Sequence, residues 1–150
     1  MGISETAPMR SIQPEAFQTS PDPTLLGGYS PTSAQFHFPR QPVCPYTGAD
    51  DVVPVELSTT ATLWGWTTVT TAPPGYAGTV PYGFGIVELN TERLRILTRL
   101  TEADTENLTF GEPMRLVCDI VDTDAEGIAI ATWAFASERD PIIDPSDSTR

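Results

Sequence analysis

The sequence predicts a mainly β protein built around a small closed barrel, and two observations point to that class. Five segments rich in threonine, valine, isoleucine and aromatic residues follow one another between residues 60 and 137, with turn-forming residues between them. No stretch of comparable length shows a convincing helical period. Five consecutive strands of this size suit the OB-fold, a five-stranded Greek-key barrel, whereas an immunoglobulin sandwich, the second choice, asks for about seven strands.

The strands are expected from Pro54 onward. The first is rich in threonine, valine and tryptophan and stops at Pro73-Pro74-Gly75, and a tight connection at Asn90-Thr91-Glu92 joins the second to the third. An acidic loop at 122–126 joins the last two. The last strand is apolar on both faces, which favours a partner over its outer face. The predicted strands are residues 60–71, 82–89, 93–101, 112–122 and 127–137.

Composition divides the rest of the chain. Four prolines and no sustained period in residues 1–23 predict a flexible arm, with at most one short helical turn around residues 14–18. Two short extended pieces, residues 25–30 and 35–39, then precede a loop that contains several prolines. The predicted organisation is an N-terminal arm at 1–23, a small subdomain at 24–53, the barrel domain at 54–137 and a flexible C-terminal tail at 138–150.

The charged residues exclude several classes of function. Asp and Glu number 20 against 8 basic residues, all of them arginine, for a formal net charge of −12. A chain without lysine cannot be a Schiff-base aldolase, a pyridoxal-phosphate enzyme or a P-loop NTPase. One histidine and two cysteines exclude a multi-histidine metal site. The negative charge also argues against duplex nucleic acid as a ligand, since binding its phosphates needs dense positive charge.

A cytoplasmic location is expected. The first residues show no basic leader followed by an apolar run, and no run of about 18 apolar residues occurs that could span a membrane. Cys44 and Cys118 offer no disulfide framework, as is usual in a reducing compartment.

Motifs on both sides of residue 54 place the chain near a known family. The motifs are Phe38-Pro39, Cys44-Pro45-Tyr46-Thr47-Gly48, Leu63-Trp64-Gly65-Trp66-Thr67, Ala72-Pro73-Pro74-Gly75-Tyr76, Pro81-Tyr82 and Ile86-Val87-Glu88-Leu89. In their order and spacing, over about residues 25–137, they resemble the acyl-CoA-associated zinc-ribbon/OB-fold family. The resemblance implies a rubredoxin-like zinc ribbon ahead of the barrel.

The ribbon departs from that family in its metal ligands. The resemblance implies that the four cysteine ligands fall on Ser30, Ser33, Cys44 and Thr47, of which only Cys44 is a thiol. Serine and threonine hydroxyls do not hold structural Zn²⁺ at neutral pH, so we expect no zinc and no cofactor bound by this chain. The degenerate ribbon is expected to keep its shape through its prolines, hydrogen bonds from the three hydroxyls and packing of its phenylalanines.

The resemblance implies a partner role. Proteins of this family resemble small subunits of thiolases, thiolase-like aldolases and acyltransferases that act on acyl-CoA thioesters, with the catalytic groups mainly in the larger partner. The chain is thus expected to be a non-catalytic accessory subunit of such a lyase or acyltransferase complex. There it would bridge subunits and shape the acyl-CoA channel, in an assembly such as (αβ)2 by family analogy. The acyl group (a steroid side chain, an aromatic acid or a short keto acid) and the choice of Claisen or aldol chemistry stay open.

Candidate contacts to the partner or to acyl-CoA lie on the barrel strands and one loop. The three arginines of the predicted third strand share one face, where they could grip CoA phosphates, dock an acidic patch or simply pair with nearby carboxylates such as Glu88 and Glu92. The loop at 73–81 joins the first two strands, and OB-folds present ligand contacts on such loops. The candidates are Pro73, Pro74, Tyr76, Tyr82, Arg93, Arg95, Arg99, Trp133 and Phe135.

Other features invite a structural interpretation. Trp64 and Trp66 share parity, so we expect them on one face of the first strand. His37 lies between two phenylalanines in an extended segment, where alternation turns it away from them, toward solvent or a partner. Gly83 and Gly85 lie inside a strand, which indicates close backbone approach or a bulge rather than a dinucleotide motif.

Two other functions remain open. OB-folds also bind single-stranded nucleic acid by stacking bases on aromatic side chains, such as the tryptophans of the first strand, although the net charge disfavours this alternative. A free-standing thioesterase or hydratase would need a positioned acid–base pair, and the chain offers only carboxylates and one histidine.

Overall fold

Five strands close into a barrel in the structure, a computed structural model that describes residues 9–140. Successive strands β6, β7 and β8 pair antiparallel, β10 pairs parallel with β8, and β9 pairs with both β10 and β6, which completes the ring. This is the predicted OB-fold arrangement. The barrel strands are β6 (Thr60–Val69), β7 (Tyr82–Leu89), β8 (Arg95–Leu100), β9 (Pro113–Thr123) and β10 (Ala129–Ser137).

The inward side chains of the barrel form one apolar core. Along β7 the buried positions include Gly83, Gly85 and Val87, as period-2 alternation requires. A Cβ atom on Gly85 would collide with the carbonyl oxygen of Gly65, so the expected close backbone approach is confirmed. The core side chains of the barrel strands are Ala61, Leu63, Val87, Leu89, Ile96, Leu100, Met114, Leu116 and Phe135.

A β-bulge in the first barrel strand separates its two tryptophans. The β6–β7 register shifts between Leu63 and Gly65, so Trp64 is the extra residue. Trp66 therefore packs against the core, whereas Trp64 is exposed. The expectation that both tryptophans share a face is wrong, because the inserted residue shifts the alternation of inward and outward side chains along the strand.

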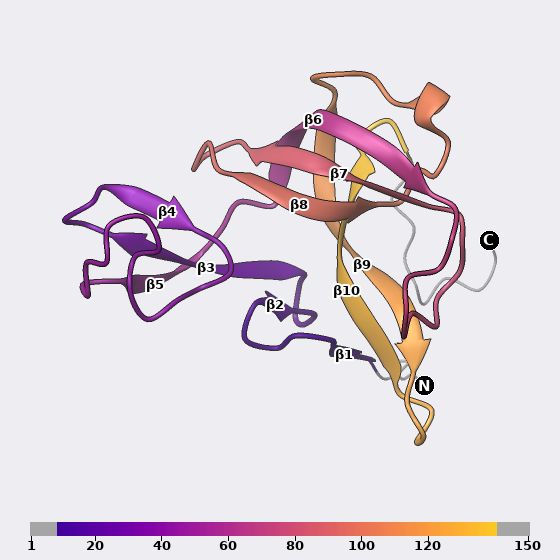
Figure 1. Cartoon of the computed structure of the whole chain (residues 1–150), viewed down its shortest axis with the longest axis horizontal. Coiled ribbons are helices and arrows are strands. Elements are labelled where there is room, and N and C mark those ends of the chain that lie inside the picture. Colours follow the sequence, from indigo (N-terminus) through magenta and orange to yellow (C-terminus); the bar gives the residue numbers. More distant parts are fainter. Residues whose placement is uncertain (1–8, 141–150) are drawn as a thin grey trace.

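A second, smaller sheet precedes the barrel and lies beside it (Figure 1). Its central strand, β3 (Thr24–Ser30), pairs antiparallel with β2 (Phe17–Gln18), β4 (Gln35–His37) and β5 (Val53–Glu56). The two extended pieces expected at 25–30 and 35–39 correspond to β3 and β4. We call strands β3, β4 and β5 with their loops, residues 24–56, the ribbon.

Residues 9–23 are part of the folded protein where a flexible arm was expected. Strand β1 (Met9–Ser11) pairs parallel with β10, and a turn with hydrogen bonds to the Gln13 carbonyl leads into β2. Phe17 is fully buried, because its ring enters the core cluster and meets Trp133 edge-on at 6.2 Å between centroids. A large apolar side chain thus fastens a segment whose composition alone indicates a linker. Residues 1–8 of the expected arm lie outside the described residues.

The first part of the expected tail is also anchored. Arg139 contacts the Glu112 carboxylate at 3.0 Å and donates to the carbonyl of Asn107, next to the short 3-10 helix η1 (Thr105–Asn107). The remainder of the expected tail, residues 141–150, lies outside the described residues. Within residues 9–140 no helix is long and apolar enough to cross a membrane.

Gly28→Ala tests the packing inside the ribbon. Gly28 lies opposite His37, and an added Cβ would come within 2.6 Å of the imidazole and 2.7 Å of Val52. We expect a loss of about 1–3 kcal/mol in unfolding free energy, because overpacking displaces a buried ring. Gly65→Ala is the matched control, since no atom lies within 4 Å of its added Cβ. Urea denaturation with equal midpoints for the two variants would contradict this packing.

Candidate functional site

One outer face of the barrel carries three of the nine predicted contact residues, Tyr82, Arg95 and Arg99. Alternation along β7 and β8 turns every second side chain outward, and the register places Ile86 opposite Leu97 and Phe84 opposite Arg99. Leu97 is 60% exposed and Ile86 38%, so the middle of this surface is apolar and open. We call this surface the β7–β8 face; it consists of Tyr82, Phe84, Ile86, Glu88, Arg95, Leu97 and Arg99.

Arg99 organises one end of the β7–β8 face. Its Nε lies 2.7 Å from Asp119, and its guanidinium lies 4.0 Å over the Tyr82 ring and 5.5 Å over the Tyr76 ring. Burial lowers the pKa of Arg99, but the Asp119 carboxylate outweighs it and the net pKa is raised. The structure thus brings Tyr76, Tyr82 and Arg99 together as one charged aromatic cluster.

The Arg99–Asp119 pair also covers the last strand. Since β10 lies between β8 and β9, the pair crosses its outer face, where Ala134 is fully buried. Part of the double-sided apolar pattern of this strand is therefore explained by the chain itself, where the sequence favoured a partner.

A second cluster closes the other end of the face. Glu88 accepts hydrogen bonds from Arg93 Nε at 2.8 Å and Arg95 Nε at 3.1 Å. The Arg95 guanidinium lies 3.6 Å over the Trp64 ring, which in turn meets Phe110 edge-on at 5.1 Å. The simpler expectation, pairing with Glu88, is confirmed for both arginines, which share this one carboxylate.

Arg93 is not part of the third strand. It has a φ of 58° in the turn before β8, and the strand begins only at Arg95. The prediction of three arginines along one strand face is wrong at this position, because the connection between the strands is two residues longer than the sequence suggested. Glu92, the other expected partner, instead accepts hydrogen bonds from the Ser58 backbone N–H and hydroxyl.

The other predicted contacts have different environments. Trp133 packs against the core and against Phe38, donates its indole N–H to the Leu97 carbonyl at 3.1 Å, and lines a cavity of about 180 Å³ together with Phe84. Phe135 points inward from β10 and is fully buried in the core. It therefore offers no surface to a partner. Pro73 and Pro74 are exposed in the turn that leads to Tyr76.

Sequence reasoning missed the apolar centre of the face. Ile86 and Leu97 are paired across two strands. The alternation of inward and outward side chains along each strand could have predicted that both residues point outward. Trp64 and Phe110 could not be found in this way, since one depends on the bulge and the other on a loop.

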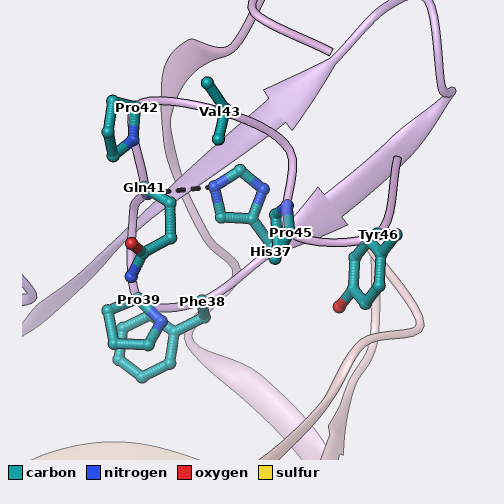
Figure 2. Close-up of a pocket in the computed structure, with 8 residues that line it drawn as sticks. All are labelled: His37, Phe38, Pro39, Gln41, Pro42, Val43, Pro45 and Tyr46. Carbon is teal, nitrogen blue, oxygen red and sulfur yellow. Dashed lines mark hydrogen bonds between the residues drawn. The ribbon is translucent and has the colours of Figure 1, made fainter. Parts of the chain in front are cut away.

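The ribbon encloses the only histidine of the chain (Figure 2). His37 is 1% exposed, its Nε2 accepts the Gln41 backbone N–H at 3.1 Å, and its Nδ1 is buried without a hydrogen-bond partner. The expected orientation toward solvent or a partner is wrong, because Gly28 opposite it leaves room for the ring to fold inward. The adjoining cavity, of about 430 Å³, is lined mostly by prolines and aromatic rings.

The four expected ligand positions of the ribbon do come together. Ser33 Oγ lies 3.1 Å from Ser30 Oγ and 2.6 Å from Thr47 Oγ1, and Ser30 Oγ donates to Asp51 at 2.6 Å. Burial raises the pKa of the Cys44 thiol, but hydrogen bonds from Thr47, Ser33 and nearby backbone outweigh it, and the net pKa is lowered. The expected hydrogen bonds of the three hydroxyls are confirmed.

These side chains do not fit a structural zinc ion. Zinc of this kind takes four thiolate or imidazole ligands, whereas three of the four positions carry hydroxyls already bonded to one another. Among residues 9–140, no group of three or more His, Cys, Asp or Glu side chains is placed to hold a metal.

Glu88→Gln tests the charge of the face. The hydrogen bond from Arg95, with the charge of Arg93, lowers the pKa of Glu88 against the opposing effect of burial. A carboxyl whose pKa is lower in the folded protein than in the unfolded protein stabilises the fold at any pH above its pKa in the unfolded protein. That stabilisation is lost as the pH falls through the pKa that the carboxyl has in the folded protein. We therefore expect Glu88→Gln to lower the Tm at pH 7 and to flatten the acid-side fall of Tm. Glu126→Gln, at an exposed loop position, is the control, and identical pH profiles for all three proteins would contradict the pairing.

A closed five-stranded barrel preceded by a small ribbon sheet defines an OB-fold protein with an exposed, partly apolar outer face. Residues 54–119 match the family model described as the C-terminal OB-fold domain of ChsH2. The chain is also 27% identical, over 112 residues, to a DUF35 domain-containing scaffold protein of Pyrococcus furiosus, across 74% of this chain and 81% of the relative.

A solved structure agrees with these matches. The chain is similar to one described as the Ltp2-ChsH2(DUF35) aldolase, with a TM-score of 0.56 and 26% identity, across 76% of this chain and 84% of that one. The family resemblance predicted from the motifs is therefore confirmed.

Proposed function

We propose that the chain is a non-catalytic OB-fold subunit that binds and supports a thiolase-like acyl-CoA enzyme. The observation that carries the proposal is the open apolar centre of the β7–β8 face, in a chain whose barrel matches the ChsH2 domain. One similar protein is described as a scaffold, and one similar structure as an aldolase of Ltp2 with ChsH2.

The composition of the face supports a protein partner. Leu97 and Ile86 form an exposed apolar centre, and arginine–aromatic clusters lie at both of its ends. Stable interfaces combine such a centre with aromatic and arginine side chains, which carry much of the binding energy. Each arginine on the face already pairs with a carboxylate of this chain, which speaks against a role in gripping nucleic-acid phosphates.

The chemistry would then belong to the partner. The chain has no lysine, its histidine is enclosed, and Cys44 is buried in the ribbon among hydroxyl groups. In this proposal the complex makes or breaks a C–C bond of a CoA thioester, as a retro-aldolase or a thiolase, on a steroid side chain or an aromatic acid. The small subunit, in a cytoplasmic assembly such as (αβ)2, bridges subunits, and the Tyr76–Tyr82–Arg99 end of the face lies along the acyl-CoA channel.

Activity of the separate and mixed proteins tests this role. A thiolase-like protein of the same organism is assayed for cleavage of an acyl-CoA thioester with and without the chain. We expect the chain alone to show no turnover and the partner's rate to rise when the chain is added. Turnover by the isolated chain, or an unchanged rate for every thiolase-like protein of that organism, would refute the proposal.

A further inference from the structure

We propose that a hydrogen-bonded cluster holds the ribbon in place of a metal ion, and that its backbone keeps the shape of a tetrahedral metal site. The cluster consists of Ser30, Ser33, Cys44, Thr47 and Asp51, and we call it the ribbon cluster. Three Ser/Thr→Cys changes should accordingly convert it into a zinc site. This inference does not depend on the proposed function, since it concerns the ribbon and not the β7–β8 face.

Two turns of the ribbon are arranged like the two halves of a metal site. Ser30 and Ser33 lie three residues apart in the turn between β3 and β4, and Cys44 and Thr47 have the same spacing in the following loop. The first turn is closed by the Ala34 N–H on the Pro31 carbonyl, the second by the Gly48 N–H on the Cys44 carbonyl at 2.8 Å. Paired ligands with two or three residues between them, on two facing turns, are how Cys₄ structural zinc sites are built.

The side chains of the two turns lie within hydrogen-bond distance of each other. Ser33 Oγ lies 2.6 Å from Thr47 Oγ1, so the two turns face each other directly. A tetrahedral ion with Zn–S bonds of about 2.3 Å sets its sulfur atoms about 3.8 Å apart. The observed oxygen–oxygen spacing is therefore about 1.2 Å shorter than the sulfur–sulfur spacing of a zinc site, as is expected where hydroxyls bond to each other without an ion between them.

The carboxylate of Asp51 is the hydrogen-bond acceptor at the end of the cluster. Asp51 Oδ1 accepts from the Ser30 hydroxyl at 2.6 Å, and Oδ2 accepts from the Thr32 backbone N–H at 2.8 Å. A group of hydroxyls needs an acceptor for its last proton, and a carboxylate gives stronger hydrogen bonds than a neutral group. Asp51 thus ties its own loop to the first turn and acts as a positioning residue for the cluster.

The gain of a zinc site is the decisive test. Full-length S30C/S33C/T47C is expected to purify with about one zinc ion per chain, to give the cobalt spectrum of a tetrahedral thiolate site and to lose Tm on addition of EDTA. The wild-type chain is expected to carry no stoichiometric zinc and to keep its Tm in EDTA. Adding C44S to the triple variant is the matched control, which should weaken the thiolate–cobalt bands.

A second measurement, on single variants of the native cluster, tests the proposal even if the triple variant does not fold. Asp51→Ala is expected to lower the Tm by about 2–4 °C, whereas Asp50→Ala at the neighbouring position should leave the Tm unchanged. Stoichiometric zinc in the wild-type protein, a folded triple variant that takes no cobalt, or equal Tm values for the two aspartate variants would each overturn the proposal.

Discussion

Leu97→Asp is expected to weaken binding of the proposed thiolase-like partner strongly. Leu97 is 60% exposed at the centre of the β7–β8 face, and its outward side chain carries none of the barrel core. An aspartate there would remove an apolar anchor and place a charge where the partner excludes water. Loss of a central anchor costs about 2 kcal/mol or more, so affinity should fall at least about 30-fold while the circular dichroism spectrum is unchanged.

Ile120→Asp is the matched control. Ile120 is 53% exposed, and it precedes the bulge on β9, on the opposite face of that strand from Asp119. The same substitution at similar exposure should therefore leave the affinity within a few-fold. Titration calorimetry with the purified partner measures both variants, and an equal loss for the two would show that the β7–β8 face is not the interface.

Phe17→Ala is expected to have the largest effect on stability. The ring is fully buried in the core cluster and meets Trp133, so its removal leaves a cavity where the N-terminal segment joins the barrel. Phenylalanine-to-alanine changes at such sites cost about 3–5 kcal/mol. Urea denaturation of the full chain should show this loss as a lower midpoint.

Phe110→Ala provides the comparison for that result. Phe110 is 60% exposed and touches Trp64 by its edge, so the same change of side chain should cost less than about 1 kcal/mol. Similar midpoints for the two variants would mean that residues 9–23 are not packed on the barrel.

The barrel was predictable because each of its strands repeats one physical pattern. In β8 the buried positions alternate strictly, and Ile96 and Leu100 point inward as their spacing of four requires. What failed were details that alternation does not contain. The bulge at Trp64 and the left-handed turn residue Arg93 each depend on how two strands meet, and neither leaves a distinct pattern in a single strand.

Segments without a period were the least predictable. Phe17 stands alone among polar residues and prolines, so nothing local shows that it fills a hole in a core built from distant strands. His37 presents the same difficulty, because its burial depends on the glycine paired with it across the ribbon. By contrast, the meeting of Ser30, Ser33, Cys44 and Thr47 was predictable, since their spacing resembles that of a known metal site and their hydroxyls can bond to one another. Asp51, which accepts a hydrogen bond from the Ser30 hydroxyl, was not predicted.

The candidate site was predictable in part. Tyr76, Tyr82 and Arg99 meet as a cluster because a loop and two strands bring them to one edge of the barrel. Phe135 was misplaced, since a strand that is apolar on both faces does not reveal which face is the core.

Light scattering on a co-expressed pair tests whether the chain is a subunit of a thiolase-like complex. The chain is co-expressed with a thiolase-like protein of the same organism, purified through a tag on that protein and passed over a size-exclusion column. We expect one peak that contains both chains at a mass near that of (αβ)2 or another fixed stoichiometry. A chain that elutes alone at the mass of its monomer, with every thiolase-like protein of that organism, would contradict it.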